Sequence, residues 1–435
     1  MELLAQLDRL DPHQTGAQLH RFASELFPIC RSITGQGIRQ TLELIAKRIP
    51  LQRFEVASGT PVFDWIVPKE WNIRDAYIKD RSGNRLADFQ ASNLHVLNYS
   101  APIHQTMRLE ELRPHLFTLP EHPEWIPYRT SYYQENWGFC LSHNQLRAMP
   151  EGEYEVCIDS TLESGSLSWG ECFLPGETDQ EILISCHACH PSLANDNLSG
   201  LTVATALAEL LGKRHNRYSY RFLFIPGTIG AITWLYENRT HVAKIAHGLV
   251  LTCIGDQGGF HYKKSRRGNA EIDRAMALAL RHCGESYELL DFSPYGYDER
   301  QYCSPGFNLP VGCLMRSVWG SFPEYHTSAD NLEFIKPEKL EKSLRLCAAA
   351  LDVLEGDRSY CNQNPYCEPQ LGRRDLYRAT GGTSPEIELH AKLWVLNFSD
   401  GHHSLLDIAE RSGLPFRAIQ HAARTLAAAD LLKHI

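Results

Sequence analysis

The segment from residue 181 to 213 sets the strongest constraint on the fold. The apolar run "EILISC" leads into the polar loop "HACHPSLANDN", and that loop leads into "LSGLTVATALAELLG", whose apolar residues recur at helical spacing. Four further runs, "YEVCID", "YRFLFIPG", "AHGLVLTCIGD" and "VGCLMRS", read as strands, and helices expected at 197–213, 270–284 and 336–355 separate several of them. Strands that alternate with helices predict an α/β fold with a mixed, mostly parallel sheet flanked by helices.

The chain is long enough for two or three domains, since it has 435 residues. Between about residues 60 and 99 the sequence pattern changes to short segments typical of β-strands, which predicts a small β-rich insertion. After the linker-like "RRDLYRATGG", three helical patterns follow, and "SGLP" joins the last two, as is typical of a winged helix. We expect a discontinuous α/β domain at 1–58 and 110–375, an inserted domain at 59–109 and a winged-helix-like domain at 380–435.

Charge and composition exclude several classes of protein. The net charge of −9 argues against a nucleic-acid partner, because phosphate binding needs a basic face. The tail offers only Arg417 and Arg424 on its third helix, which favours packing or dimerisation, and so a homo-oligomer, over DNA reading. The sequence contains no run long enough for a membrane span, and "MELLAQLDRLDPHQ" does not resemble a signal peptide. Thirteen scattered cysteines suggest reduced thiols and a cytoplasmic location.

Residue types that bind metals gather on three loops, each of which follows or flanks an apolar strand. Because such loops converge on one rim of a sheet, their side chains can meet at a single ion. Zinc takes histidine, aspartate, glutamate or cysteine ligands, and a catalytic site leaves one position open for water. The candidates are His187, His190 and Asp196 on the first loop, Asp256 on the second, and Glu324, His326 and Asp330 on the third.

Four segments, taken in order, resemble the zinc aminopeptidase family. "RSITGQGIRQTLELIAKRI" resembles its opening, "ANDNLSG" its bridging-aspartate loop, "YGYDERQYCSPGFNLPVG" its Ser-Asp-His stretch, and "EYHTSADN" its last-histidine motif. The arrangement is most similar to a bacterial aminopeptidase-like branch with a small inserted domain and a winged-helix tail. The resemblance, over roughly residues 15–355, implies a zinc exopeptidase-like fold.

Carried over residue by residue, the resemblance implies metal ligands. Asp196 would be the central carboxylate and His326 the final imidazole. The first ligand is either His187 or His190, and we prefer His190 because it lies nearer to Asp196 and Pro191 restricts its backbone. Asp256 would correspond to a further carboxylate ligand of the other zinc.

One segment departs from the family. Where the family has paired glutamates, a general base and a zinc ligand, "FLFIPGTIG" has Gly227 and Thr228. Neither residue can accept a proton from water or bind zinc as a carboxylate does, so the second metal site is impaired and we predict one zinc. A substitute base would be Glu299, by preference, or Asp298 or Glu324.

The sequence therefore predicts a zinc-dependent hydrolase of an amide or peptide bond, with a peptide or small-molecule amide as substrate. Arg300 and Tyr302 would stabilise the oxyanion or hold a substrate carboxylate. Aromatic residues of "PYRTSYYQENWGFC" would wall the pocket or pack in the core. Two alternatives stay open: a degenerate hydrolase fold that binds metal without cleaving, and a cysteine nucleophile at Cys186 or Cys189.

Overall fold

A computed structural model describes residues 2–376 and 386–435. At its centre lies an eight-stranded sheet with the order β1-β10-β12-β11-β13-β16-β14-β15. β12, β11, β13 and β16 run parallel to one another, whereas β10 and β14 join this block antiparallel. This is the mixed, mostly parallel sheet that the sequence predicted. The strands are β1 (Gln52–Ala57), β10 (Ser166–Leu174), β11 (Glu181–His187), β12 (Ser219–Ile225), β13 (Ile245–Leu251), β14 (Phe260–Lys263), β15 (Tyr287–Leu290) and β16 (Val311–Met315).

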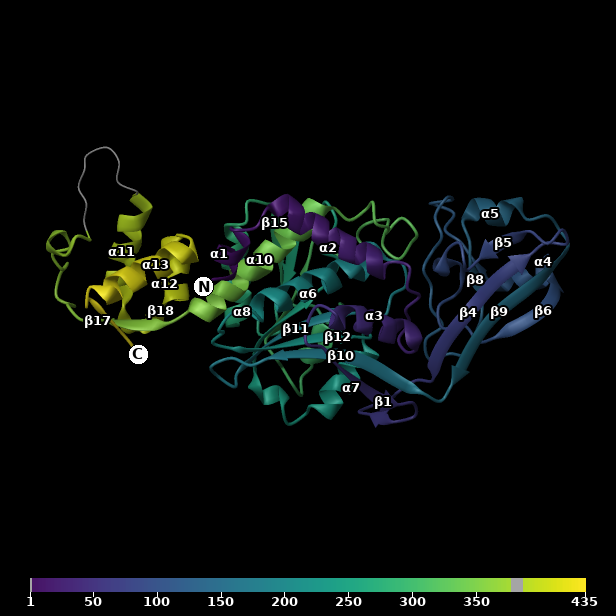
Figure 1. Ribbon diagram of the computed structural model, residues 1–435, viewed down its shortest axis with the longest axis horizontal. Helices are drawn as coiled ribbons and strands as arrows, with labels where there is room; N and C mark the ends of the chain where they lie inside the picture. The colour runs from purple at the N-terminus through teal and green to yellow at the C-terminus, as the bar shows by residue number, and fades with distance from the viewer. Residues whose placement is uncertain (1, 377–385) are drawn as a thin grey trace.

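Helices cover both faces of the large sheet. α2, α6, α8 and α10 lie together on one side, and α7 lies on the other (Figure 1). The expected helices at 270–284 and 336–355 are confirmed as α8 and α10, and most of the expected helix at 197–213 is α6. The helices of this domain are α1 (Leu3–Leu7), α2 (Pro12–Leu26), α3 (Gln36–Ala46), α6 (Gly200–Leu211), α7 (Ile229–Glu237), α8 (Glu271–Arg281), α9 (Glu299–Tyr302) and α10 (Pro337–Gly356).

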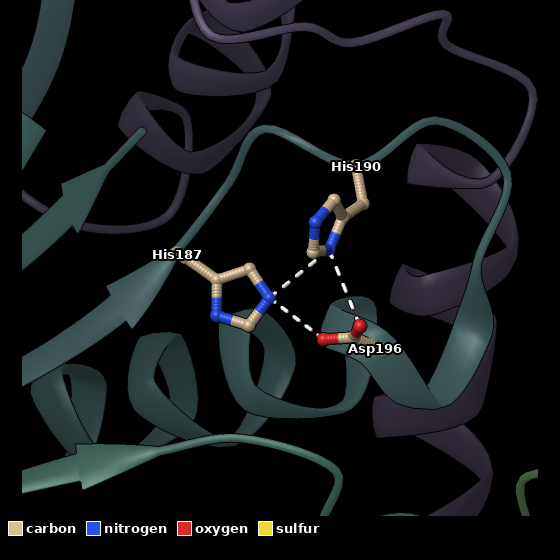
Figure 2. A group of neighbouring side chains, drawn as sticks. All are labelled: His187, His190 and Asp196. Atoms are coloured by element: carbon tan, nitrogen blue, oxygen red, sulfur yellow. Dashed lines mark hydrogen bonds and ion pairs between the residues drawn. The ribbon is translucent and has the colours of Figure 1, made fainter. Parts of the chain in front are cut away.

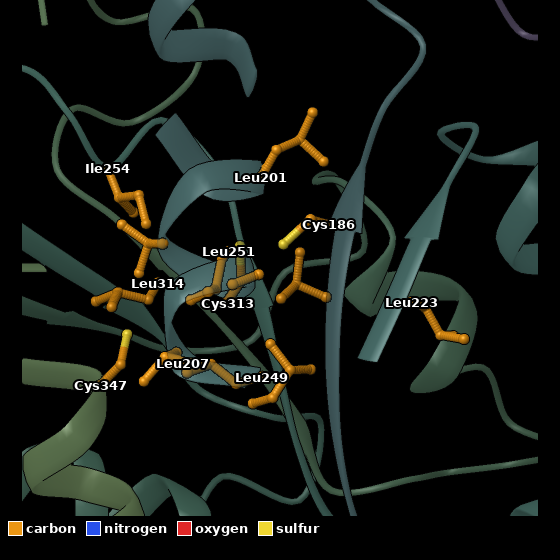
Figure 3. Close-up of a cluster of buried hydrophobic side chains, with 14 of the residues drawn as sticks. Cys186, Leu201, Leu207, Leu223, Leu249, Leu251, Ile254, Cys313, Leu314 and Cys347 are labelled. Atoms are coloured by element: carbon orange, nitrogen blue, oxygen red, sulfur yellow. The ribbon is translucent and has the colours of Figure 1, made fainter. Parts of the chain in front are cut away.

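The core forms where α6 and α10 pack on the parallel strands. Leu201 and Leu207 of α6 and Leu249 of β13 belong to one buried cluster, in which Leu207 lies beside Leu249 and the thiols of Cys186, Cys313 and Cys347 take part (Figure 3). Cys186 is fully buried there, and its Sγ lies 3.4 Å from the carbonyl oxygen of Gly200. Buried cysteine behaves as a small apolar side chain. Burial raises the pKa of the Cys186 thiol well above its usual value, so a nucleophilic thiolate at Cys186 is not supported.

The insertion is built on its own four-stranded sheet, with the order β5-β4-β9-β6. It lies at the opposite end of the α/β domain from the winged helix (Figure 1). Its sheet consists of β4 (Glu70–Lys79), β5 (Arg85–Asp88), β6 (Ile103–Arg108) and β9 (Glu153–Glu163). Shorter elements complete this region: β2 (Pro61–Val62), β3 (Trp65–Ile66), α4 (Leu109–Leu112), β7 (Leu116–Phe117), β8 (Phe139–Cys140) and α5 (His143–Ala148).

One strand differs from its prediction. "YEVCID" was expected in the large sheet, but it belongs to β9, which pairs antiparallel with β4 and β6 in the small sheet. The range 59–109 therefore does not contain all the strands of the insertion. The physical reason is visible in the burial pattern: β9 alternates between buried and half-exposed residues, whereas every residue of β11 is buried. Alternation is the pattern of a strand with one solvated face.

The C-terminal region is a winged helix, as predicted. It consists of α11 (Glu386–Phe398), β18 (Asp400–Ser404), α12 (Leu405–Ser412), α13 (Phe416–Ala428) and β19 (Leu432–His434). Its sheet also takes in β17 (Ser359–Asn362), which lies between β18 and β19. The domain therefore begins before residue 380. Residues 377–382 of the predicted linker lie outside the described residues.

The third helix of the winged helix faces the α/β domain. Arg417 on α13 makes ion pairs with Glu2 at 3.3 Å and with Asp8 at 3.1 Å, and Arg424 pairs with Glu2 at 2.9 Å. On α8, Arg274 pairs with acidic residues of α12. The two arginines that a DNA-reading helix would offer are thus engaged within the chain. Within the described part of the chain, no helix combines the length and apolar character that a bilayer crossing requires.

A cluster of charged residues around Glu285 should make the stability of the fold depend on pH in the acid range. Glu285 accepts hydrogen bonds from Lys342, Arg316 and Lys339. Burial raises the pKa of Glu285, but these three cations outweigh it and lower the pKa to about 2. A folded-state pKa below the unfolded value contributes stability above about pH 4.5, and that stability disappears as the pH falls toward 2.

Replacing Glu285 with glutamine should therefore cost about 2–3 kcal/mol near neutral pH, and the difference from the native chain should shrink below about pH 4.5 and vanish only below about pH 2. Thermal unfolding midpoints of the two proteins, measured across this range, test the expectation. A difference that persists unchanged at the acid end would assign the effect to packing and not to charge.

Candidate metal centre

The first metal-binding loop follows directly from the central strand of the sheet. β11 ends at His187, and Asp196 lies in a π-type turn at Ala194–Ser199 that leads into α6. The Asp196–Asn197 peptide bond is cis. The carboxylate of Asp330 accepts hydrogen bonds from the backbone N–H groups of Asn195, at 2.6 Å, and of Asp196, at 3.0 Å. Asp330 therefore fixes the turn that presents the Asp196 side chain.

Asp196 is surrounded by imidazoles. His187 Nε2 lies 2.7 Å from Oδ1 of Asp196, and His190 Nδ1 lies 3.4 Å from Oδ2 (Figure 2). The two imidazole nitrogens are 3.2 Å apart. These three side chains form one compact group whose ligand atoms all lie within 4.8 Å of one another, and all three residues are at least nine-tenths buried.

His326 reaches the same carboxylate from the third loop. Its Nε2 lies 3.0 Å from Asp196 Oδ2, and its side chain is 34% exposed, so it stands on the open side of the group. The structure thus brings three imidazoles to the carboxylate of Asp196, those of His187, His190 and His326. Oδ2 of Asp196 faces His190 and His326, whereas Oδ1 faces His187.

The hydrogen bonds around His187 bear on which of its nitrogens carries the proton. Asn197 donates from Nδ2 to the carbonyl of Leu251 at 2.9 Å, and its Oδ1 accepts from the Gly200 N–H at 3.2 Å, so the amide orientation is fixed. Nδ2 also lies 3.3 Å from His187 Nδ1 and 3.4 Å from the His187 carbonyl oxygen. When Nδ1 is the acceptor, a neutral ring carries its proton on Nε2, which donates to Asp196. In that tautomer His187 orients Asp196, and His190 is the imidazole of this loop that can bind a metal.

Burial and charge set the protonation states of the group. Burial raises the pKa of Asp196, but His190 and His187 outweigh burial and hold that pKa well below its usual value. Burial lowers the pKa of His187 to about 4 and also lowers the pKa of His326. A charged carboxylate among neutral imidazoles is the donor set that zinc requires.

The other predicted carboxylate ligand is engaged elsewhere. Asp256 accepts hydrogen bonds from Asn195 Nδ2 at 2.7 Å, Ser317 Oγ at 2.7 Å and the Gly258 N–H at 2.6 Å. Among the described residues, His326 contacts Asp196, whereas neither Asp256 nor Glu324 has a hydrogen bond or ion pair with it. Asp256 therefore braces the loop, and its expected role as a ligand is not supported.

Three tyrosines surround the histidines. The ring of Tyr128, from the "PYRTSYY" segment, meets His190 and His326 edge-on at 5.2 and 5.1 Å, and Tyr325 stacks on His326 at 3.9 Å. Tyr297 lies against His187 with ring centroids 3.8 Å apart. Sequence reasoning singled out neither Tyr297 nor Tyr325, although each stands beside a residue that it did select.

Tyr297 also occupies the space of the missing glutamates. A Cβ atom added to Gly227 would come within 2.1 Å of the Tyr297 hydroxyl oxygen. A side chain at position 227 is therefore incompatible with this placement of Tyr297.

The predicted catalytic residues separate into two groups. Glu299 is fully buried and pairs with Lys263 Nζ at 2.6 Å, and Tyr302 is fully buried with its hydroxyl 2.9 Å from Ser185 Oγ. Both are packing residues in this structure, so the preference for Glu299 as base is not supported. Asp298 and Arg300 differ from them, because Asp298 Oδ2 and Arg300 Nε are buried atoms without a hydrogen-bond partner among the described residues.

Asp298 contacts the backbone of the segment that carries Gly227 and Thr228. Its Oδ1 accepts a hydrogen bond from the backbone N–H of Thr228 at 2.7 Å. Burial raises the pKa of Asp298 to about 7, against the opposing effect of that hydrogen bond. A carboxyl group with a pKa near the working pH is suited to moving protons.

The cysteine hypothesis fails at Cys189 as well. Its Sγ accepts from the Gly227 N–H at 3.2 Å, and burial raises the pKa of the thiol to about 12. The nucleophilic form of cysteine is the thiolate, which is negligible at neutral pH under these conditions. Cys189 is a buried packing residue beside the metal group.

A mixed sheet whose carboxyl-end loops gather histidines round one aspartate defines the zinc-aminopeptidase class of fold. A family model described as a domain of unknown function (DUF4910) matches residues 20–357, and one described as winged helix-turn-helix matches residues 358–434. The chain belongs to the DUF4910 family, with a C-terminal winged-helix domain.

Relatives and solved structures agree with this assignment. A Clostridium acetobutylicum protein, named as a candidate polysaccharide biosynthesis protein with an aminopeptidase-like domain, is 52% identical over 421 residues, 97% of each chain. A crystal structure described as a candidate peptidase from the same species has a TM-score of 0.94 at 50% identity, over 98% of this chain and 97% of that one. A zinc aminopeptidase from Bacillus subtilis shares the fold at 11% identity, with a TM-score of 0.57 over 78% of this chain and 94% of the other.

Proposed function

We propose that this chain is a zinc-dependent hydrolase that cleaves an amide or peptide bond with water. The observation that carries the proposal is the position of two imidazoles, His190 and His326, at 3.4 and 3.0 Å from the same oxygen of Asp196. Ligand atoms that surround zinc tetrahedrally, at about 2.0–2.1 Å, lie roughly 3.3 Å apart. The donor set therefore fits one zinc ion in both chemistry and spacing.

Each residue of the group has a distinct task in this proposal. His190 Nδ1, Asp196 Oδ2 and His326 Nε2 would hold the ion, and His187 would orient Asp196 by donating from Nε2. A bound zinc ion would supply a Lewis acid that polarises the substrate carbonyl and lowers the pKa of water. Only one ion is expected, because Gly227 and Thr228 replace the glutamates of the second site.

Asp298 is the proton carrier that we assign to the reaction. Oδ2 would accept a proton from the attacking water and return it to the leaving nitrogen, while Oδ1 stays on the Thr228 N–H. The unpartnered Oδ2 supports this role, because enclosed carboxylate oxygens rarely lack a partner. Arg300, whose Nε is also unpartnered, would bind a substrate carboxylate or the developing oxyanion.

The bond that is cleaved belongs to one of two substrate classes. The names of the structural neighbours favour a peptide, and the name of the Clostridium relative favours an N-acylated sugar. Elemental analysis and a panel of amino-acid amides, dipeptides and N-acyl sugars, each assayed with added zinc, test the proposal. We expect about one zinc per chain and turnover of at least one class.

A second candidate function is a metal-containing binding protein without catalysis. The replacement of the glutamate pair, with the Tyr297 hydroxyl filling its space, favours this alternative. Zinc bound at one per chain, with no turnover across the panel but saturable binding of one panel member, would select it over the hydrolase.

We expect no nucleic-acid partner in either function. Arg417 and Arg424 of α13 are paired with Glu2 and Asp8, and the chain is acidic overall. A duplex-DNA complex in a mobility-shift assay at physiological salt would contradict this inference.

A further inference from the structure

A second pocket lies at the end of the sheet opposite to the metal group. Its walls include Gln180, Tyr218 and Pro310, which immediately precede β11, β12 and β16, and His247 near the start of β13. The metal group follows the other end of β11. Ser359, Ser404 and His434 of the winged helix close the far side, so both domains contribute to the pocket. Its volume is about 680 Å³, which is within the range of small-molecule sites.

Three arginines face this pocket without an acidic partner. Arg217 donates from Nη1 to the carbonyl oxygen of Asp357 at 2.9 Å, and Arg358 donates to the same oxygen at 2.8 Å. Arg267 donates from Nε to the carbonyl oxygen of Asn308 at 3.0 Å. Within residues 2–376 and 386–435, the side-chain hydrogen bonds of these three guanidinium groups go to carbonyl oxygens. The charge of Glu355 acts on Arg358, but the Glu355 carboxylate accepts from the backbone N–H groups of Arg217 and Tyr218.

The arginines act on one another and on a buried histidine. Burial lowers the pKa of Arg358, and the charge of Arg217 lowers it further. Burial lowers the pKa of His247 to about 4, with Arg217 and Arg267 adding to the effect. His247 is 5% exposed, and its Nδ1 has no hydrogen-bond partner among the described residues. Three guanidinium groups and an unpartnered imidazole nitrogen around one cavity offer the donors that an anion binds.

The wall also carries acidic groups, namely Asp357, Glu271 and the carboxyl-terminal residue Ile435. Asp357 accepts a hydrogen bond from the backbone N–H of Leu406 at 2.8 Å, and burial raises its pKa. Glu271 is 54% exposed and faces His247 Nε2 at 3.4 Å. Both carboxylates are thus held away from the guanidinium groups.

We propose that this pocket binds the phosphate group of a small anionic ligand between the α/β domain and the winged helix. Guanidinium groups bind phosphate through paired N–H donors, and His247 Nδ1 with the hydroxyls of Ser359 and Ser404 supplies further polar contacts. The volume admits a ligand the size of a hexose phosphate or a nucleoside monophosphate. Such a ligand joins the two domains, since it contacts both. This site is independent of the hydrolase proposal.

Titration calorimetry on the full chain tests the site with three phosphate probes: inorganic phosphate, a hexose phosphate and a nucleoside monophosphate. The free hexose and the nucleoside serve as matched controls. We expect saturable binding of at least one phosphate probe and none of the controls. Tighter binding of a phosphorylated compound identifies a metabolite as the ligand, and equal affinities identify inorganic phosphate. Absence of saturable binding of every phosphate probe up to about 10 mM overturns the proposal.

Three variants locate the binding. Arg267→Gln, at an exposed position, and Arg358→Gln should each weaken phosphate binding about tenfold or more, because each removes one charged donor pair. Arg147→Gln, on the exposed face of α5 in the insertion, should bind as the native chain does. Unchanged affinity in both Arg267→Gln and Arg358→Gln would overturn the assignment to this pocket. Thermal unfolding of each variant shows that it is folded.

Discussion

Replacing His326 with alanine is expected to abolish both zinc retention and amide hydrolysis. The variant loses one of the two imidazoles that face Asp196 Oδ2, and two remaining ligands do not hold zinc at physiological concentrations. Zinc per chain, measured by elemental analysis after dialysis, should fall from about one to near zero, and turnover should fall to background. Because His326 is partly exposed, the substitution leaves the core intact. Turnover that persists in the zinc-free variant would reject the mechanism.

His187 supplies the matched comparison within the same group. In the proposed arrangement, His187 donates to Asp196 and is not itself a ligand. His187→Gln should therefore retain zinc with an affinity lowered by about 10–100-fold, the usual cost of removing a residue that orients a ligand. His215→Ala, at an exposed position, should change neither quantity. Complete zinc loss in His187→Gln with retention in His326→Ala would exchange the two roles.

The second large effect is expected at Asp298. Asp298→Asn keeps the size of the side chain but cannot accept a proton, so kcat should fall by about 10²–10⁴-fold while zinc content stays the same. The native pH profile should rise through the pKa of Asp298, about 7, since the base works only when it is deprotonated. The asparagine variant should lose this rise. An unaltered profile would show that another group carries the proton.

Glu299→Gln is the control for this assignment, because the two carboxylates are neighbours with different partners. The substitution leaves the buried Lys263 ammonium without its counter-ion, which should cost about 3–5 kcal/mol of stability. At a temperature where the variant is folded, its kcat should stay within about tenfold of the native value. The opposite pattern, with full stability and a collapsed kcat, would identify Glu299 as the base.

Several features of the fold could be predicted because the residues that encode them are local. Burial along a single segment is visible in its own residues. It produces the continuous apolar runs of β11 and β12 and the helical spacing of apolar residues in α6, α8 and α10. β9 is the exception. Its alternation of buried and half-exposed residues is local and is typical of a strand with one solvated face, yet "YEVCID" was assigned to the large sheet. Pairing between segments far apart in the sequence, as of β9 with β4, depends on which faces meet.

The sequence also indicated which loops carry metal-binding side chains, because His187, His190, Asp196 and His326 follow strands that must end at one rim of the sheet. Their order and the resemblance to zinc aminopeptidases are properties of the chain alone.

Partner choice among polar groups was decided only in three dimensions. The sequence offers no reason to give the neighbouring carboxylates of Glu299 and Asp298 different roles. In the structure Lys263 neutralises Glu299, whereas Asp298 Oδ2 has no hydrogen-bond partner among the described residues. Likewise, the carboxylate of Asp256 accepts hydrogen bonds from Asn195 and Ser317 and so stabilises the loop. Hydrogen bonds and ion pairs act over a few ångströms, so the role of a buried charge depends on neighbours that the fold brings together from distant parts of the sequence.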